Sequence, residues 1–123
     1  MNTENTGNTF IQWERGIKLA QGKYIWIAES DDVAECGFLQ TLVEQLEKTP
    51  TAVVAYSHST MIGSDGKELS YTWHKKGSSG AINIFESNDF LRKKMLVDSR
   101  IYNPSMAVFR KSVFSLLPKD YQE

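Results

Sequence analysis

The chain has 123 residues, of which 41% are hydrophobic and 24% charged, a composition typical of one globular domain spanning residues 1–123. Its formal net charge is −1 and its lysines and arginines are spread along the whole sequence, so we expect no basic face and no nucleic-acid partner. No apolar run approaches the roughly 20 residues of a membrane span and the N-terminus has no signal segment, so we expect no transmembrane segment.

The first half of the chain predicts alternating helices and strands. Apolar residues at helical spacing predict a helix over residues 8–20, and Gly22 is placed to end it in a left-handed conformation. A short aromatic and β-branched run over residues 23–28 predicts a buried parallel strand that ends at an acidic cluster. A second amphipathic helix is predicted over residues 37–48, followed by a strand over residues 52–57.

A β-hairpin is predicted next. Residues 63–67 have the glycine and aspartate residues of a turn, and a weaker strand follows over residues 68–73. The glycine and serine residues of 75–80 predict a loop, for which a plain connection is the simpler interpretation.

The last part of the chain returns to the alternating pattern. Ser87 and Asn88 can cap a helix that runs to about Met95. Residues 105–110 predict a strand, and residues 111–117 predict a short helix. Because strands alternate with helices, we expect an α/β layered domain with a largely parallel sheet plus the β-hairpin.

Three carboxylates follow the first predicted strand within four residues, at Glu29, Asp31 and Asp32. In open parallel sheets, ligands bind at the carboxyl ends of strands. Clustered carboxylates repel one another, and a hard divalent cation such as Mg²⁺ or Mn²⁺ relieves that repulsion while also binding phosphate oxygens. The cluster therefore predicts a metal and diphosphate site.

Two other interpretations of the acidic cluster stay open from the residues alone. Asp31 and Asp32 can cap or charge the start of the next helix, where acidic residues stabilise by roughly 0.3–1 kcal/mol. A phosphoacceptor receiver domain also places acidic pairs at strand ends, although such a domain usually opens with the acidic strand, whereas here a helix comes first.

The cluster belongs to a longer pattern. The sequence Asn5-Thr6-Gly7 is followed by a helix and by Gly22-Lys23-Tyr24-Ile25, and it leads to Glu29-Ser30-Asp31-Asp32. This pattern resembles the signature of family 2 glycosyltransferases, in which an Asn-x-Gly loop and a helix precede a strand ending in Asp-x-Asp-Asp. The resemblance continues through residues 38–66 and 103–110 and covers most of the chain, with only a loose match over residues 75–99.

The resemblance implies a GT-A nucleotide-sugar-binding fold in which the Asp-x-Asp element binds the ribose of the donor and the metal that bridges its diphosphate. By position, Glu29 and Asp31 are then donor-binding, Asp31 and Asp32 are the metal ligands for Mg²⁺ or Mn²⁺, and Asn5 and Gly7 shape the donor loop. Glu29 stands where the family commonly has aspartate, which lengthens that side chain by one methylene group.

Four further residues are assigned to the acceptor side. The resemblance places Asn103 and Ser105 there, just before the last predicted strand. Trp73 and His74 precede the glycine loop, where an aromatic face can stack on a sugar ring. His58, the other histidine, has neither the spacing of a metal pair nor that of a catalytic triad.

Family members begin with strands that hold the nucleotide base, and inverting members use a downstream carboxylate as general base. We therefore expect residues 1–123 to be the central part of a GT-A domain, without the N-terminal nucleotide-binding strands and without the C-terminal catalytic-base region. Asp120 lies too soon after Pro118 to be that base, so no catalytic residue is assigned.

The function implied is metal-assisted transfer of a sugar from a nucleotide diphospho-sugar to a hydroxyl acceptor, a glycan or lipid-linked sugar, with inversion, as in polysaccharide biosynthesis. The alternative is a non-catalytic truncated domain that forms homo-oligomers through an exposed sheet edge. Cys36 is the single cysteine, which favours a reducing compartment and a cytoplasmic location.

Overall fold

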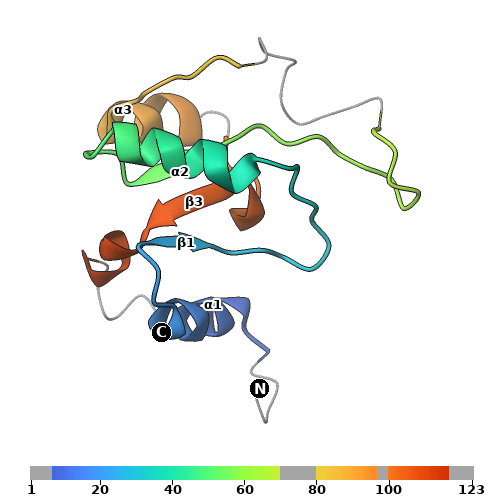
Figure 1. Ribbon diagram of the computed structural model, residues 1–123, viewed down its shortest axis with the longest axis horizontal. Coiled ribbons are helices and arrows are strands. Elements are labelled where there is room, and N and C mark those ends of the chain that lie inside the picture. The colour runs from blue at the N-terminus through green and yellow to red at the C-terminus, as the bar shows by residue number, and fades with distance from the viewer. Residues whose placement is uncertain (1–6, 70–79, 97–99, 117–123) are drawn as a thin grey trace.

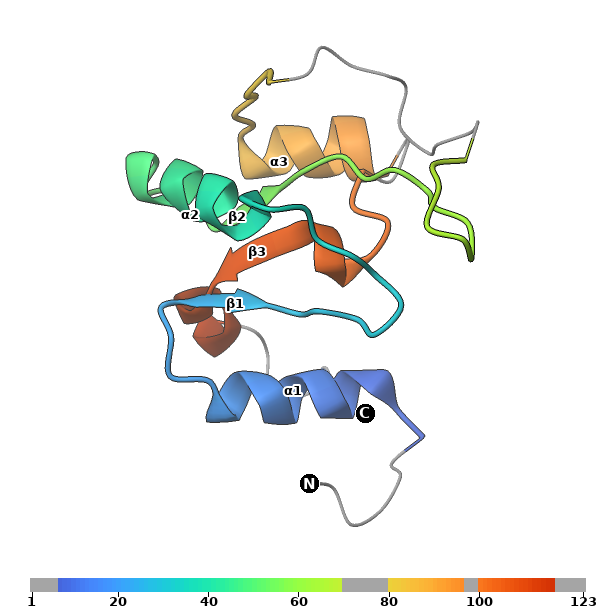
Figure 2. The same ribbon diagram turned by 45° about the vertical axis from the view of Figure 1, so that its right-hand side comes forward.

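The computed structural model describes residues 7–69, 80–96 and 100–116. In this part of the chain three strands form one sheet in the order β1-β3-β2 (Figure 1). Helices α2, Phe38–Lys48, and α3, Ser87–Phe90, lie on the β2 side of the sheet, and helix α1, Thr9–Leu19, lies beyond β1 (Figure 2). The strands are β1, Tyr24–Trp26; β2, Val54–Tyr56; and β3, Ala107–Arg110.

The sheet is antiparallel in both of its pairings. Ile25 of β1 lies opposite Phe109, and Ala55 of β2 lies opposite Val108. The prediction of a largely parallel sheet is therefore wrong for the described residues. β1 and β2 do run in the same direction, as expected for strands joined through a helix, but β3 lies between them and runs the opposite way. As a consequence, the end of β1 lies beside the start of β3.

Helix α1, Thr9–Leu19, confirms the first predicted helix but ends differently from the prediction. Asn8 caps it, because its Oδ1 accepts hydrogen bonds from the N–H groups of Phe10 at 2.9 Å and Ile11 at 3.4 Å. At the other end the chain leaves the helix through Ala20 in an extended conformation, and Gly22 has no positive φ. The predicted left-handed cap at Gly22 is therefore wrong.

Helix α2, Phe38–Lys48, supplies two of the three residues of the buried core cluster. Leu42 and Leu46 are buried against Val108 of β3, and partly buried neighbours surround this cluster. The helix begins after Gly37, whose φ of 88° places it in the left-handed region that favours glycine. The apolar face predicted from the sequence is thus the face that packs on β2 and β3.

Arg110 fastens the end of α2 to the sheet. Its guanidinium donates to the carbonyl oxygens of Leu46 and, at 3.3 Å, Thr49, which end the helix. Its Nε donates to the Ala52 carbonyl at 2.6 Å, and its Nη1 to the Tyr24 hydroxyl at 3.2 Å. One side chain of β3 therefore satisfies carbonyl groups that a helix end leaves without partners.

The hairpin turn is confirmed. Ile62 and Glu68 form an antiparallel bridge, the Gly63 N–H donates to the Lys67 carbonyl at 2.9 Å, and Gly66 has a φ of 75°. The rest of the predicted second strand, from residue 70 to 73, lies outside the described residues.

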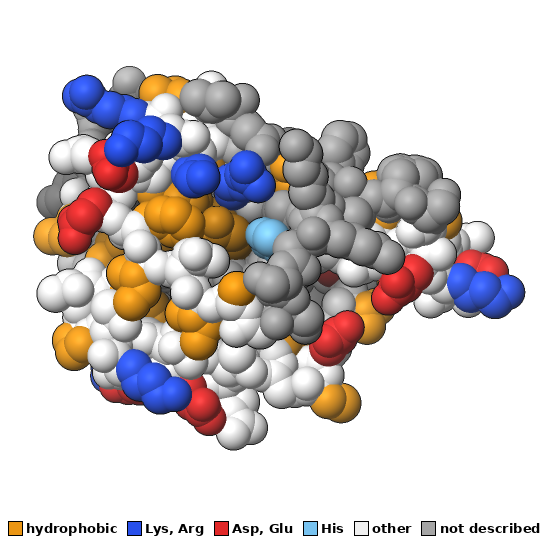
Figure 3. All heavy atoms as spheres, turned by 90° about the horizontal axis from the view of Figure 1, so that it is seen from above, with side chains coloured by type: hydrophobic (Ala, Val, Ile, Leu, Met, Phe, Trp, Pro, Cys, Tyr) orange, Lys and Arg blue, Asp and Glu red, His pale blue; other side chains and the backbone are white. Residues whose placement is uncertain are grey.

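The third predicted helix is confirmed in extent as α3, Ser87–Phe90, continued by a π-helical turn, Leu91–Met95. Its predicted cap is wrong, because the residue before the helix is Glu86 and no side chain caps it. No residue of this segment is buried and Leu91 is 53% exposed, so it adds little to the core. Apolar side chains lie close to lysines and arginines on the face in Figure 3. None of the helices in the described ranges has the length and apolarity that crossing a membrane requires.

The last predicted strand begins later than the sequence indicates. A 3₁₀-helical turn, Pro104–Met106, comes before β3, and Asn103 caps that turn. A second 3₁₀-helical segment, Lys111–Leu116, takes the place of the predicted C-terminal helix.

Candidate metal centre

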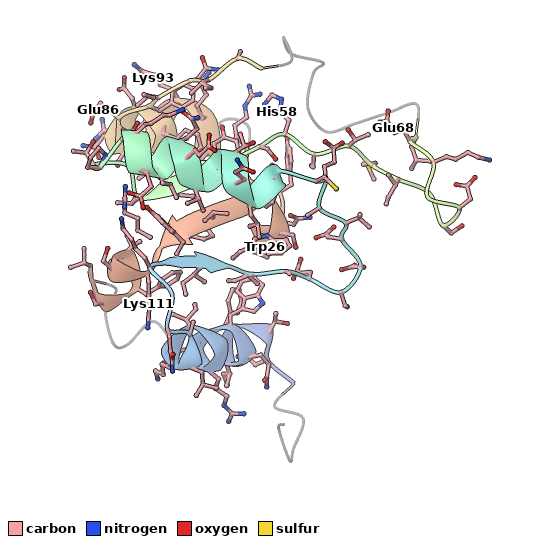
Figure 4. All side chains as sticks on the ribbon, viewed as in Figure 1. Trp26, His58, Glu68, Glu86, Lys93 and Lys111 are labelled. Atoms are coloured by element: carbon pink, nitrogen blue, oxygen red, sulfur yellow. The ribbon has the colours of Figure 1, made fainter. Side chains whose placement is uncertain are left out.

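The acidic cluster lies in the loop that follows β1. One carboxylate oxygen from each of Glu29, Asp31 and Asp32 lies within 4.8 Å of the others. Glu29 is half-buried, and the two aspartates are exposed. In Figure 4 the loop leaves the strand just past the labelled Trp26 and reaches away from the helices that cover the sheet. The three acids therefore converge beyond the carboxyl end of the strand, and Asp31 and Asp32 face solvent.

The turn before β3 holds the backbone at the start of this loop. The Ser105 hydroxyl accepts a hydrogen bond from the Glu29 N–H at 2.9 Å. The Ser105 carbonyl accepts from the Trp26 indole N–H at 2.8 Å. Because β3 runs antiparallel to β1, the residues that precede β3 lie beside those that follow β1.

The same turn also contacts the other end of residues 29–32, which we call the acidic loop. The Asn103 side-chain amide donates from Nδ2 to Asp32 Oδ2 at 3.0 Å. Within the loop, the Asp32 N–H reaches the Glu29 carbonyl at 3.4 Å. The acidic loop is thus hydrogen-bonded at both of its ends, Glu29 and Asp32, to the turn before β3, which lies 71 or more residues away along the chain.

The charges of the cluster repel one another. Burial raises the pKa of the Glu29 carboxyl above its usual value, and the charges of Asp32 and Asp31 raise that pKa further. Glu47 behaves in the opposite way, because the Lys23 ammonium donates to it at 2.8 Å and lowers its pKa. The ion pairs found among the described residues use other acids than the three of the cluster. The cluster is therefore a place where added positive charge is favourable.

The aspartates do not cap the next helix. Helix α2 begins at Phe38, its cap position is Gly37, and no side chain makes a capping hydrogen bond there. The first turn of α2 also contains no acidic residue. The interpretation of Asp31 and Asp32 as a helix cap is therefore wrong, and the cluster needs another explanation.

The donor set suits a hard divalent cation. Carboxylate oxygens are the ligands that Mg²⁺ and Mn²⁺ prefer, and these ions commonly keep water and phosphate oxygens in their remaining positions. The exposure of Asp31 and Asp32 leaves space on the solvent side for such oxygens. Cys36, the only thiol, is exposed and does not belong to the cluster.

Comparison with known proteins identifies the family. The family model described as "Glycosyl transferase family 2" matches residues 1–117, nearly the whole chain. The chain belongs to glycosyltransferase family 2. Membership confirms the resemblance carried by residues 5–32, implies a GT-A fold, and excludes the receiver-domain interpretation.

A curated relative is also named as a glycosyltransferase. This family 2 sequence is 31% identical over 71 residues to "Glycosyltransferase GlyG" of Streptococcus pneumoniae serotype 4. The match takes in 58% of this chain and 24% of the relative, so the chain spans about a quarter of that relative's length. No solved structure shows significant similarity to the chain.

The remaining predicted residues of this family 2 chain fall into two groups, those that the structure describes and those outside the described ranges. Gly7 is described and lies just before the Asn8 cap of α1 with a φ of 62°, in the left-handed region, whereas Asn5 lies outside the described residues. Trp73 and His74 also lie outside them. The donor and acceptor roles given to these four residues stay predictions.

Sequence reasoning missed how Asn103 and Ser105 contact the acidic loop. The sequence places both on the acceptor side, and that role stays a prediction. The sequence does not predict their hydrogen bonds to Asp32 and to the Glu29 backbone. In a parallel sheet the residues before β3 would lie at the opposite end of the strands from the residues that follow β1. The signal that was available is the pair of polar residues around Pro104, directly before an apolar strand.

Proposed function

We propose that this chain carries the donor and metal site of an inverting glycosyltransferase that moves a sugar from a nucleotide diphospho-sugar to a hydroxyl acceptor, a glycan or a lipid-linked sugar. Family membership supports sugar transfer in general. The observation that carries the finer proposal is the convergence of three carboxylates at the end of β1. In this proposal Asp31 and Asp32 bind the metal ion. Glu29 and Asp31 also face the nucleotide diphospho-sugar donor.

The proposed chemistry depends on the charge of the leaving group. Sugar transfer breaks the bond between the anomeric carbon and the diphosphate, which then carries more negative charge than before. A bound Mg²⁺ or Mn²⁺ supplies Lewis-acid stabilisation of that charge. Three clustered carboxylates without bound cations repel the diphosphate, so in this proposal donor binding depends on the ion.

The loop geometry supports a preformed site. Ser105 and Asn103 tie the two ends of the acidic loop to the turn before β3, so less order has to be gained when the ion binds. In this proposal Asn5 and Gly7 shape the donor loop, and Trp73 and His74 contribute on the acceptor side. We assign no general base within residues 1–123.

Binding of Mn²⁺ tests the proposal. The free Mn²⁺ signal in electron paramagnetic resonance would be titrated with the native chain and with Asp31→Asn, each with and without UDP or GDP. We expect Asp31→Asn to weaken Mn²⁺ binding by at least about 10-fold, since it removes one charged ligand while preserving the shape of the side chain. We also expect one of the nucleotides to bind more tightly when Mn²⁺ is present.

A matched control is Glu35→Gln. Glu35 is an exposed acid near the cluster but outside it, so the substitution makes the same change in net charge without removing a proposed ligand. Equal losses of Mn²⁺ affinity in Asp31→Asn and Glu35→Gln would show that negative charge attracts the ion to this region without a specific site. That result, or native binding no tighter than that of either variant, would overturn the site.

A second candidate function is assembly through the edge of β1. The Lys111 N–H donates to the Lys23 carbonyl at 2.9 Å, so by the alternation of an antiparallel ladder the backbone groups of Tyr24 and Trp26 point away from β3. β1 is an edge strand of the described sheet, and such an edge can pair with a strand of a second copy. Light scattering over a concentration series tests this candidate, because a mass that stays monomeric at every concentration would rule it out.

A further inference from the structure

Asn103 makes two hydrogen bonds with opposite ends of its side-chain amide. Its Oδ1 accepts from the Met106 N–H at 3.1 Å, which caps the turn before β3. Its Nδ2 donates to Asp32 Oδ2 at 3.0 Å. The two bonds join the turn to a carboxylate of the acidic loop.

The backbone fixes which end of the amide faces Asp32. The Met106 N–H can only donate, so the amide oxygen of Asn103 must point toward it. The NH₂ group of Asn103 is then directed at Asp32, where it meets an acceptor. The reversed amide would bring an oxygen against a carboxylate and an NH₂ group against an N–H, and would lose both bonds.

A neutral donor suits this position better than a cation would. A lysine or arginine here would form an ion pair with Asp32 and compete with a metal ion for its charge. An amide satisfies one lone pair of the carboxylate, leaves its charge in place, and limits the orientations of its side chain. The hydrogen bond therefore orders Asp32 while leaving it able to bind a cation.

The same turn orders the other end of the loop through Ser105. Its side chain accepts from the Glu29 N–H, its carbonyl accepts from the Trp26 indole, and the residue is only 8% exposed. Ser105, not Asn103, contacts the backbone at Glu29. A substitution that keeps the cap at position 103 but loses the NH₂ group should therefore free the Asp32 side chain without releasing Glu29.

We propose that Asn103 is a positioning residue for the metal site, which holds the Asp32 carboxylate in the orientation that binds the ion. This inference rests on the proposed function, because it assumes that Asp32 is a metal ligand. It differs from an acceptor-side role for Asn103, which would leave the affinity for Mn²⁺ unchanged.

The test substitution is Asn103→Ser. Serine also caps turns, so it can keep the bond to the Met106 N–H, but it is too short to reach Asp32. We expect Mn²⁺ binding to the full chain, measured by electron paramagnetic resonance, to weaken by roughly 10-fold, as is typical when a partner of a metal ligand is removed. Thermal unfolding in EDTA should stay close to that of the native chain.

Asn88→Ser is the matched control, because Asn88 is exposed in α3, away from the acidic loop. If the serine variant of Asn103 does not fold, Asn103→Thr makes the same test with another capping residue. Equal Mn²⁺ affinity in the native chain and in a folded Asn103 variant would overturn this inference alone. Absence of Mn²⁺ binding by the native chain would overturn the metal site itself, and the inference with it.

Discussion

Replacement of Glu29 by glutamine should stabilise the chain when no metal is present. Glu29 faces the charges of Asp31 and Asp32 within 4.8 Å. Two unit charges at that distance repel by about 0.9 kcal/mol at the dielectric constant of water, so two such pairs amount to about 1.7 kcal/mol. Screening over a Debye length of about 8 Å at physiological ionic strength roughly halves that figure. We expect Glu29→Gln to raise the free energy of unfolding by about 1 kcal/mol or slightly less.

The pH dependence of this gain follows from the raised pKa of Glu29. A carboxyl whose pKa is higher in the folded chain than in the unfolded chain destabilises the fold when it is ionised. The increase in the free energy of unfolding caused by Glu29→Gln should therefore be complete at pH values above the pKa that Glu29 has in the folded chain. It should fall as the pH drops, and disappear below the unfolded value of about 4.3. Added salt should also reduce the gain.

The assay is urea unfolding followed by circular dichroism in EDTA at several pH values, with Glu35→Gln as the control for a charge lost outside the cluster. In saturating Mn²⁺ we expect the native chain to be more stable than Glu29→Gln, because the ion should stabilise the native chain more than the variant. A neutral or destabilising effect of Glu29→Gln in EDTA, with the same pH dependence as Glu35→Gln, would refute the account of the cluster as a site of unrelieved repulsion.

Three further predictions concern the fold and use the same unfolding assay. Gly37→Ala should lower the free energy of unfolding by about 1–2 kcal/mol, because Gly37 has a φ of 88°. Gly16→Ala should raise it by about 0.5–1 kcal/mol, because Gly16 lies inside α1 with no heavy atom near the added methyl group. Equal effects of the two substitutions would contradict the assigned backbone conformations. Leu46→Ala should lower the free energy of unfolding by about 2–5 kcal/mol. Leu116→Ala, at a residue that is 80% exposed, should change it by no more than about 0.5 kcal/mol. A small loss of stability in Leu46→Ala would contradict the place of Leu46 in the core. Arg110→Met should lower the free energy of unfolding by about 1–3 kcal/mol, since it leaves carbonyl groups at the end of α2 without hydrogen-bond donors. An unchanged stability would show that these hydrogen bonds are not formed in solution.

The local elements were predictable because their signals are local. Helix α2 has an apolar face at helical spacing, a glycine before its first turn and Pro50 beyond its end, and it forms where these signals place it. Strand β1 is a short aromatic and β-branched run, and the three acidic residues that follow it lie within four positions of the sequence. The convergence of their carboxylates therefore required no knowledge of the rest of the fold.

The strand pairing was not predictable in the same way. Nothing within residues 105–110 indicates that this strand lies between two others and runs against both. The alternation of helices and strands does predict that β1 and β2 run in the same direction, and they do. The direction of β3 depends on how the chain returns after β2, through segments whose sequence pattern is weak.

The part of the site that depends on pairing was missed for that reason. The bond between Asn103 and Asp32 joins residues 71 positions apart, and it exists because the start of β3 lies beside the end of β1. The bond from the Glu29 N–H to Ser105 spans 76 positions and has the same origin. Contacts of this kind follow from the direction of one strand, which the sequence pattern leaves undetermined.

Paramagnetic relaxation by Mn²⁺ tests the central claim most directly, because it locates the bound ion. Amide resonances of the ¹⁵N-labelled chain would be recorded during titration with substoichiometric Mn²⁺. We predict that the amides of residues 29–32 and of Asn103 and Ser105 broaden first, and that those of Ser112, beyond the far end of β3, broaden last. Broadening centred away from the acidic loop, or equal broadening throughout the chain, would contradict a metal site at the end of β1.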